Sequence, residues 1–271
     1  MRFLPSLLLL ASSAFYTLSL AAPARLNNTE VSALGFDDFD ATAQHFPLSE
    51  HEKRDLEARA TAGVLTTCKD PNHFALTFDD GVYTYGKSIR QTLEKNGAKG
   101  TFFARYKAGH VIGSHTWSHP DIATITPAQL NKQLDLVETA LQKILGVKPR
   151  LFRAPYGSIT SANLKVLQSR GYTTVGWTFD SNDANGRAPA DSVKDYNKLA
   201  KSKGVIALNH ETKEGTAKTV IPGVVSGLKS EGYKLVDVAT CLGVSPYQSV
   251  GTMGKRDKTW TCAGTLEPGQ V

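Results

Sequence analysis

Short apolar runs alternate with amphipathic stretches along the chain from about residue 68 onward. Such runs are typical of strands buried in a parallel sheet, and the stretches between them have helical spacing. The clearest helix is expected at 127–145, where Leu130, Leu134 and Val137 share one face and Thr126 provides the cap. The alternation predicts an α/β protein built around a parallel sheet or barrel. Strands are expected at 73–78, 100–104, 111–115, 151–153, 173–177, 205–209 and 234–237, and further helices at 87–95, 161–170, 192–203 and 222–230.

One connection breaks this alternation. Only six residues, 105–110, separate the strands expected at 100–104 and 111–115. A crossover between parallel strands needs roughly a dozen residues or more, usually with a helix. Either these two strands are not parallel neighbours, or one crossover helix is missing near residues 104–111.

The first 54 residues differ from the rest of the chain. Arg2, an apolar run and then small residues predict a secretory signal peptide over residues 1–21. Residues 22–54 are polar and acidic and stop at the dibasic pair Lys53 and Arg54, which predicts a propeptide. An ordered amino-terminal extension is the alternative. The folded domain would then cover residues 55–246, and a polar tail would follow at residues 247–271.

Composition and charge exclude several classes of protein. Hydrophobic residues make up 41% and charged residues 21%, which is typical of a globular domain. The net charge of +6 is not concentrated in a basic stripe, so nucleic-acid binding is not indicated. The apolar run near the start is too short to span a membrane. A secreted chain with three cysteines is expected to form one disulfide, and a Cys68–Cys241 bond would join the two ends of the domain and leave Cys262 over.

Two polar motifs follow the first expected strands. Asp79 and Asp80 stand in Thr-Phe-Asp-Asp-Gly, where one carboxylate could bind a metal and the other a substrate or water. His115 and His119 are four residues apart in His-Thr-Trp-Ser-His-Pro and could complete a facial metal site with Asp80. Such a set leaves positions open for water and substrate, as metal-assisted hydrolysis requires. Each motif also has a structural interpretation, because Asp-Asp-Gly is a common turn and paired histidines are as often structural.

Two more motifs lie at later strand ends. In Arg-Ala-Pro-Tyr-Gly, Arg153 could orient a carboxylate, and the amide of Tyr156 could donate to an oxyanion. His210 stands in Leu-Asn-His-Glu after a buried run. A single histidine there is usually structural, although here it would join three other polar strand ends.

In this order the four motifs resemble those of the polysaccharide deacetylases of carbohydrate esterase family 4, which share the NodB-homology domain. Within that family the chain is most similar to the secreted fungal chitin deacetylases, over about residues 67–243. The resemblance implies a distorted parallel (β/α) barrel and the removal of acetyl groups from N-acetylglucosamine polymers. It also implies one divalent metal ion, commonly Zn²⁺, with Co²⁺ as an alternative. We expect a monomer that acts on chitin or chitooligosaccharides outside the cell or at the cell wall.

The resemblance also implies roles for the motif residues. Asp79 would be the general base, and Asp80, His115 and His119 would hold the metal. His210 would be the general acid that protonates the leaving amine.

Further residues would support this chemistry by resemblance. Arg153 would orient Asp79, Asp183 would hold Arg153 in turn, and Thr116 would brace the turn between the two histidines. The backbone amide of Tyr156 would stabilise the oxyanion. The substrate, including its acetyl methyl group, would be bound by Tyr156, Trp177 and Leu208.

The chain departs from the family pattern at three places. Ala184 stands where family members usually have Trp, and Glu211 stands where they usually have Asp. Compared with family members, roughly twenty residues are absent between Ala104 and Arg105, which is consistent with the crossover minimum. The hypothesis we favour is a gene-model or splicing error, which sequencing the transcript would test.

Two other functions share these features. The chain could be an acetylxylan or other polysaccharide O-acetyl esterase, because a metal site does not choose between an amide and an ester. It could also be a catalytically inactive carbohydrate-binding relative, which the short connection favours and the complete set of polar residues opposes.

Overall fold

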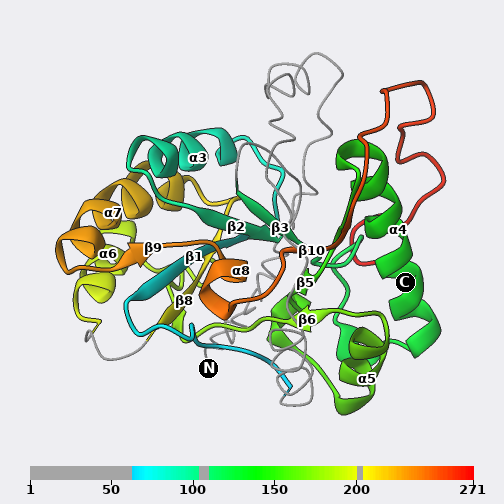
Figure 1. Cartoon of the computed structure of the whole chain (residues 1–271), viewed down its shortest axis with the longest axis horizontal. Helices are drawn as coiled ribbons and strands as arrows, with labels where there is room; N and C mark the ends of the chain where they lie inside the picture. The colour runs from blue at the N-terminus through cyan, green and yellow to red at the C-terminus, as the bar shows by residue number, and fades with distance from the viewer. Residues whose placement is uncertain (1–62, 104–109, 200–203) are drawn as a thin grey trace, which may run out of the picture.

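A parallel sheet forms the centre of the computed structural model, which describes residues 63–103, 110–199 and 204–271 (Figure 1). The expected signal peptide, propeptide and dibasic pair therefore lie outside the described residues. The strand order is β3-β2-β1-β8-β7, and β9 pairs with the start of β1 on the edge opposite β8. The strands are β1 (His73–Asp79), β2 (Gly100–Phe103), β3 (Val111–Gly113), β7 (Phe179–Asp180), β8 (Val205–His210) and β9 (Lys234–Leu235).

Further pairings curl this sheet into a distorted barrel. Ser114, directly after β3, forms a parallel bridge to Phe152 in β5 (Leu151–Phe152), which pairs with β6 (Thr173–Thr174). Residues 173–180 thus pair with β5 at their start and with β8 at their end. The predicted α/β barrel is confirmed.

Helices cover the barrel on two sides (Figure 1). They are α3 (Gly86–Lys95), α4 (Pro127–Leu145), α5 (Ser161–Ser169), α6 (Pro189–Asn197), α7 (Ile221–Ser230) and α8 (Val238–Leu242). Short helical turns are η1 (Ile122–Thr124), η2 (Pro155–Gly157) and η3 (Thr216–Val220). α3, α6 and α7 gather on one side, and α4 and α5 lie at the opposite end. In the described part of the chain, no helix is long and apolar enough to cross a membrane.

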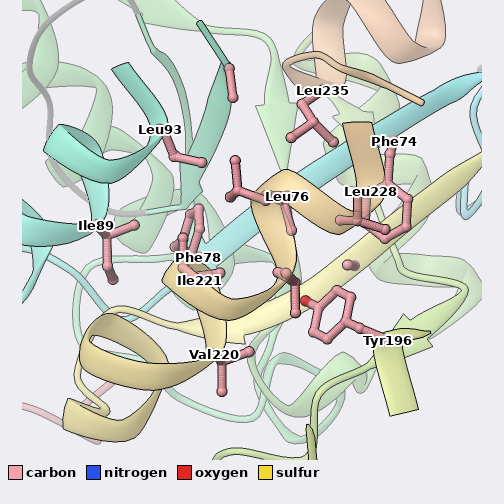
Figure 2. Packing of buried hydrophobic residues seen from close by; sticks show 14 of the residues in the cluster. Phe74, Leu76, Phe78, Ile89, Leu93, Tyr196, Val220, Ile221, Leu228 and Leu235 are labelled. Carbon is pink, nitrogen blue, oxygen red and sulfur yellow. The ribbon is translucent and has the colours of Figure 1, made fainter. Parts of the chain in front are cut away.

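The two faces of β1 explain how the core and the site are separated. Phe74, Leu76 and Phe78 point towards the helices and are fully buried in one apolar cluster (Figure 2). Burial of each such side chain contributes about 1.5–3 kcal/mol. Because side chains alternate along a strand, Thr77 and Asp79 point to the opposite face, inside the barrel. One face of β1 therefore packs in the apolar core, and the other face carries polar side chains of the candidate site.

β2 and β3 are parallel neighbours, with Thr101 opposite Val111. The first alternative for the short connection, that these two strands are not parallel neighbours, is therefore wrong. Residues 104–110 connect the strands, and residues 104–109 lie outside the described part. His110 is buried, and its Nδ1 accepts a hydrogen bond from the Gly100 N–H at 3.0 Å.

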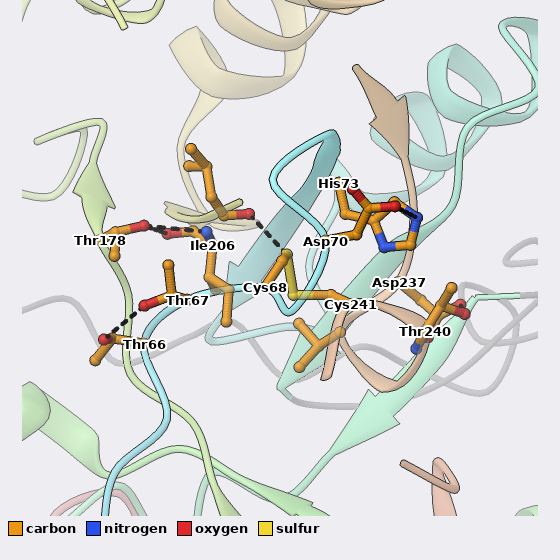
Figure 3. Close-up of a disulfide and its surroundings, with 12 residues drawn as sticks. Thr66, Thr67, Cys68, Asp70, His73, Thr178, Ile206, Asp237, Thr240 and Cys241 are labelled. Carbon is orange, nitrogen blue, oxygen red and sulfur yellow. Dashed lines mark hydrogen bonds and ion pairs between the residues drawn. A yellow bond between two sulfur atoms is a disulfide. The ribbon is translucent and has the colours of Figure 1, made fainter. Parts of the chain in front are cut away.

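A disulfide joins Cys68, ahead of β1, to Cys241 in α8, as predicted (Figure 3). Their Cα atoms are 4.6 Å apart across a sequence separation of 173 residues. Cys262 lies exposed near the C-terminus and takes no part in this bond.

The segment expected as a polar tail begins inside the fold. Its first residues form β10 (Tyr247–Val250), which pairs antiparallel with β4 (Val147–Pro149). Both strands are short and carry few apolar residues, so neither produced a signal in the sequence. The chain then runs back along α4, where the Gly254 N–H donates to the Lys143 carbonyl at 2.8 Å.

Candidate active site

The predicted site residues meet at one edge of the barrel, because parallel strands end together. Asp79 is the last residue of β1 and is the register partner of His210, the last residue of β8. Asp180 in β7 is the register partner of Leu208. Such carboxyl-terminal edges are where α/β folds place their ligands.

Asp80, His115 and His119 form the candidate metal site. Their ligand atoms all lie within 4.8 Å of one another. His119 Nε2 is 3.4 Å and His115 Nε2 is 3.6 Å from the same Asp80 oxygen. Two imidazoles and one carboxylate converging on one point fit a divalent transition-metal ion. The donor set predicted from sequence is therefore brought together.

The two histidines are oriented by different partners. His115 Nδ1 lies 2.8 Å from the Arg153 carbonyl oxygen. Because a carbonyl only accepts, Nδ1 carries the proton and Nε2 is left for a metal. The Thr116 hydroxyl accepts from the His119 N–H at 3.1 Å, so Thr116 braces this turn. Burial and the neighbouring His115 lower the pKa of His119, which favours the neutral, ligating imidazole.

The backbone is strained where the site is built. Asp80, Thr116, His119 and Tyr156 have φ values between 57° and 65°, a region that non-glycine residues rarely occupy. Such conformations cost about 1–3 kcal/mol each and persist where surrounding contacts enforce them. Their concentration around the three converging ligands marks this edge as functional.

Arg153 crosses the barrel interior to the candidate base. Its Nη1 donates to Asp79 Oδ1 at 2.8 Å and to the Thr77 hydroxyl at 2.7 Å, and Nη2 donates to the Gly176 carbonyl at 3.0 Å. Arg153 is completely buried, and its guanidinium lies over the ring of Phe103. Burial lowers the pKa of Arg153, and the charge of Asp79 opposes that effect. The predicted Arg153–Asp79 contact is present.

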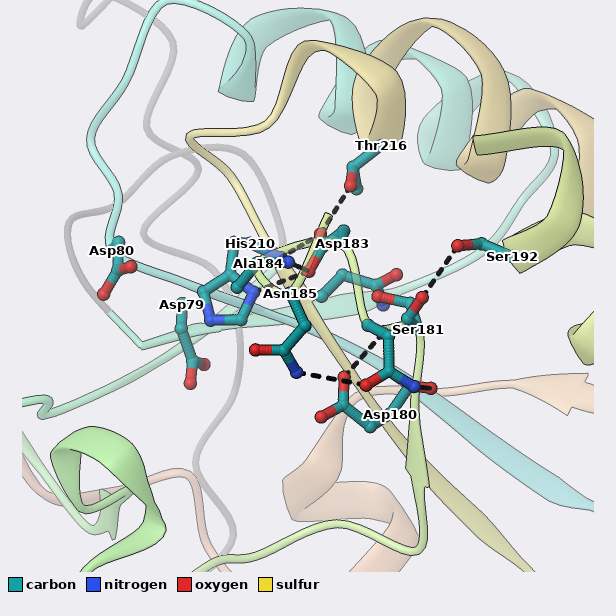
Figure 4. Close-up of polar contacts among 12 residues, drawn as sticks. Asp79, Asp80, Asp180, Ser181, Asp183, Ala184, Asn185, Ser192, His210 and Thr216 are labelled. Atoms are coloured by element: carbon teal, nitrogen blue, oxygen red, sulfur yellow. Dashed lines mark hydrogen bonds and ion pairs between the residues drawn. The ribbon is translucent and has the colours of Figure 1, made fainter. Parts of the chain in front are cut away.

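The predicted partner of Asp183 was wrong. Its carboxylate accepts from His210 Nδ1 at 2.7 Å, from the His210 backbone N–H at 2.8 Å and from the Thr216 hydroxyl, instead of binding Arg153 (Figure 4). Asp183 follows β7, which pairs with β8, so it reaches the strand end that carries His210. Burial opposes the protonated imidazole, but the hydrogen bond and charge of Asp183 outweigh it and raise the pKa of His210.

Ala184 and Glu211 are the two residues that differ in type from the family pattern, and both make contacts close to the candidate site. Ala184 donates its N–H to the Asp183 carboxylate at 2.8 Å and contributes no large side chain. Glu211 is buried and accepts from the Tyr83 N–H at 3.0 Å. Burial raises the pKa of Glu211 to about 7. A Cβ on Gly86 would come within 1.8 Å of this carboxylate, so the loop after Asp80 is shaped around a longer acidic side chain.

The residues expected at the substrate pocket lie around the same edge. Tyr156 is 71% exposed, and its ring meets that of His119 edge-on at 4.7 Å. Leu208 is buried two residues before His210. Trp177 is half-buried, and its ring lies against Gly157 and 5.6 Å from the Arg153 guanidinium carbon.

Gln133 was missed by the sequence analysis. It lies fully buried on the apolar face of α4, and its Oε1 accepts from the backbone N–H groups of Trp117 and Ser118, both at 2.9 Å. It thus fixes the turn between the two metal-ligand candidates. The available signal was a polar side chain within the stripe formed by Leu130, Leu134 and Val137.

A candidate base and acid beside a facial set of metal ligands is the arrangement of a hydrolase. Comparison with known proteins agrees. Residues 66–175 match the polysaccharide deacetylase family model. A chitin deacetylase of Pestalotiopsis is 35% identical over 199 residues, covering 66% of this chain and 67% of that protein. One of Colletotrichum lindemuthianum is 32% identical over 208 residues, covering 67% of this chain and 84% of that protein.

The fold is shared as well. The solved structure of the chitin deacetylase from the fungal pathogen Colletotrichum lindemuthianum aligns with a TM-score of 0.65 at 29% identity, covering 69% of this chain and 96% of that one. The chain therefore belongs to the polysaccharide deacetylase family. It is a hydrolase that acts on amide bonds.

Proposed function

We propose that this protein is a secreted, metal-dependent deacetylase that removes N-acetyl groups from chitin or chitooligosaccharides and releases acetate. One observation carries the proposal. Asp79 and His210 stand opposite each other on neighbouring strands beside the Asp80, His115 and His119 set, and each has its own buried partner. The chitin deacetylases among its relatives support the substrate class.

Asp80, His115 and His119 would hold the metal, which we take to be Zn²⁺ because a site with two histidines and one carboxylate suits it. Such an ion, when bound, activates water and polarises the acetyl carbonyl. Asp79, oriented by Arg153, accepts the proton of the attacking water.

His210 completes the hydrolysis. Once water has added to the acetamide carbon, the C–N bond breaks and the amine needs a proton. The raised pKa of His210 keeps it protonated for this step, because Asp183 stabilises the imidazolium. The backbone amide of Tyr156 donates to the oxyanion, and Leu208 and Trp177 line the space for the methyl group.

The disulfide supports secretion, because such bonds persist in oxidising compartments. A signal peptide over residues 1–21 and a propeptide over residues 22–54 would provide the route. We propose action as a monomer, outside the cell or at the cell wall.

Metal content and acetate release, measured on one preparation of the full chain from a secreting host, test the proposal. We expect about one zinc per chain, acetate from N-acetylglucosamine oligomers, and loss of both on chelation. Acetate released from acetylated xylan but not from these oligomers would contradict the proposal and show that the protein is an O-acetyl esterase. Oligomer binding without acetate release would replace it with a binding protein.

A further inference from the structure

The end of the chain lies against the turn that carries His119. The Gly269 N–H donates to the Ser118 carbonyl at 2.5 Å, and the Trp117 indole N–H donates to the Leu266 carbonyl at 3.2 Å. The Ser118 hydroxyl also donates to the Gln270 carbonyl. Residues 266–271, named here the C-terminal segment, are thus bound through their backbone to the loop between the metal-ligand candidates.

Gln133 joins this segment to the helix behind it. While its Oε1 accepts from two N–H groups of the turn, its Nε2 donates to the Ser118 hydroxyl at 2.7 Å and to the Gln270 carbonyl at 3.0 Å. All four hydrogen-bonding positions of one buried carboxamide are therefore used. The turn, α4 and the C-terminal segment form one hydrogen-bonded unit.

A cavity of about 590 Å³ lies between the C-terminal segment and the metal site. His119 and Tyr156 line one side, and Gly269 and Val271 line the other. Asp121 and Gln129 add polar groups to the lining. Its volume falls in the range of roughly 300–1,000 Å³ that is usual for small-molecule sites.

We propose that the C-terminal segment is a wall of the substrate groove and that this cavity binds the sugar unit next to the one being deacetylated. The proposal rests on the proposed function. The exposed Tyr156 ring offers an apolar face to a pyranose ring, while Asp121 and Gln129 can bind hydroxyl groups. The segment would therefore determine the preference for oligomers over a single N-acetylglucosamine.

Gly269→Pro tests this wall without replacing any of the three metal-ligand candidates. Gly269 has φ 79°, which proline cannot adopt, and proline also lacks the N–H that Ser118 accepts. Deletion of residues 266–271 is the second variant. Gln270→Ala is the matched control, because it keeps the backbone carbonyl that Ser118 and Gln133 contact and removes only the hydrogen bond that Gln270 Oε1 accepts from the Glu267 N–H within the segment.

The readouts are kcat and KM for the tetramer and for N-acetylglucosamine, and their binding affinities in an Asp79→Asn background. We expect Gly269→Pro and the deletion to weaken tetramer binding about tenfold, equivalent to about 1.4 kcal/mol, with monosaccharide binding and the control unchanged. Equal losses for both ligands, no loss, or faster turnover after deletion would overturn the proposal. If the wild type releases no acetate, the proposed function fails. The ratio of tetramer affinity to N-acetylglucosamine affinity, compared between wild type and variants, still decides whether the C-terminal segment forms a wall of the groove.

Discussion

Asp79 and His210 are register partners at the ends of two neighbouring parallel strands, β1 and β8. The backbone ladder therefore fixes the candidate base and acid relative to each other. Each side chain then receives a separate buried partner, Arg153 for Asp79 and Asp183 for His210. Arg153 follows β5 and reaches Asp79 across the barrel interior, whereas Asp183 follows β7, the strand that pairs with β8, so the two partners come from different segments of the chain.

Asp183→Asn should shift the pH dependence of deacetylation. His210 must be protonated to act as an acid, so activity falls as pH rises through its pKa. Asp183 raises that pKa, and a neutral amide would not. The alkaline limb of kcat should therefore move to lower pH, together with a decrease in kcat of about 10²-fold. A pH series of kcat on a soluble oligomer measures both effects.

Asp180→Asn is the matched control for this shift. Asp180 lies on the same segment as Asp183, but its charge acts on Arg153. The alkaline limb should stay in place in this variant. An equal displacement in both variants would show that the effect is a general change in charge and would refute the specific role of Asp183.

Arg153→Met should destabilise the protein by about 3–5 kcal/mol, because it leaves the carboxylate of Asp79 buried without its counter-ion. Adding Asp79→Asn removes that charge and should restore part of the loss. Urea unfolding of both single variants and the double variant, at one fixed metal concentration, gives the coupling energy. Strict additivity of the two losses would contradict a direct interaction.

Replacing Cys68 and Cys241 together by Ser should lower the free energy of unfolding by about 2–5 kcal/mol. The bond closes a loop of 173 residues, so it restricts much of the unfolded chain. Cys262→Ser, which lies outside this bond, is the control and should leave the unfolding midpoint unchanged. A stability in the double variant equal to that of the wild type would show that the disulfide is dispensable for the fold.

The sequence was sufficient for those parts of the site that depend on local pattern. Asp80, His115 and His119 each follow a recognisable buried strand, and parallel strands bring such ends to one edge. The partner of Asp183 could not be predicted, because it depends on the pairing of β7 with β8. β7 has only two residues, Phe179 and Asp180, and a strand this short shows no periodic pattern in the sequence.

Contacts between distant, weakly patterned segments were missed for the same reason. The pairing of β10 with β4 and the contact of residues 266–271 with Ser118 join segments more than 90 residues apart. Gln133 was overlooked because helical periodicity identifies a buried face but does not say which backbone groups that face meets.

His110 should make the fold sensitive to acid. Burial, followed by the nearby charges of Lys99 and Arg90, lowers the pKa of His110 to about 4 from its ordinary value of 6.5. Protonation also removes the acceptor of the Gly100 N–H, although Glu94 lies 3.6 Å from Nε2. Because the folded-state pKa is lowered, this stability is fully present above pH 6.5 and is lost as pH falls towards 4.

The loss attributable to His110 should be on the order of 3 kcal/mol across this window. His110→Asn isolates it, because the asparagine oxygen can accept from the Gly100 N–H and does not titrate. Urea unfolding at a series of pH values should give a steeper decline for the wild type than for this variant between pH 6.5 and 4. Parallel declines would mean that other groups cause the acid sensitivity, and that the pairing of β2 with β3 tolerates a charged imidazole at His110.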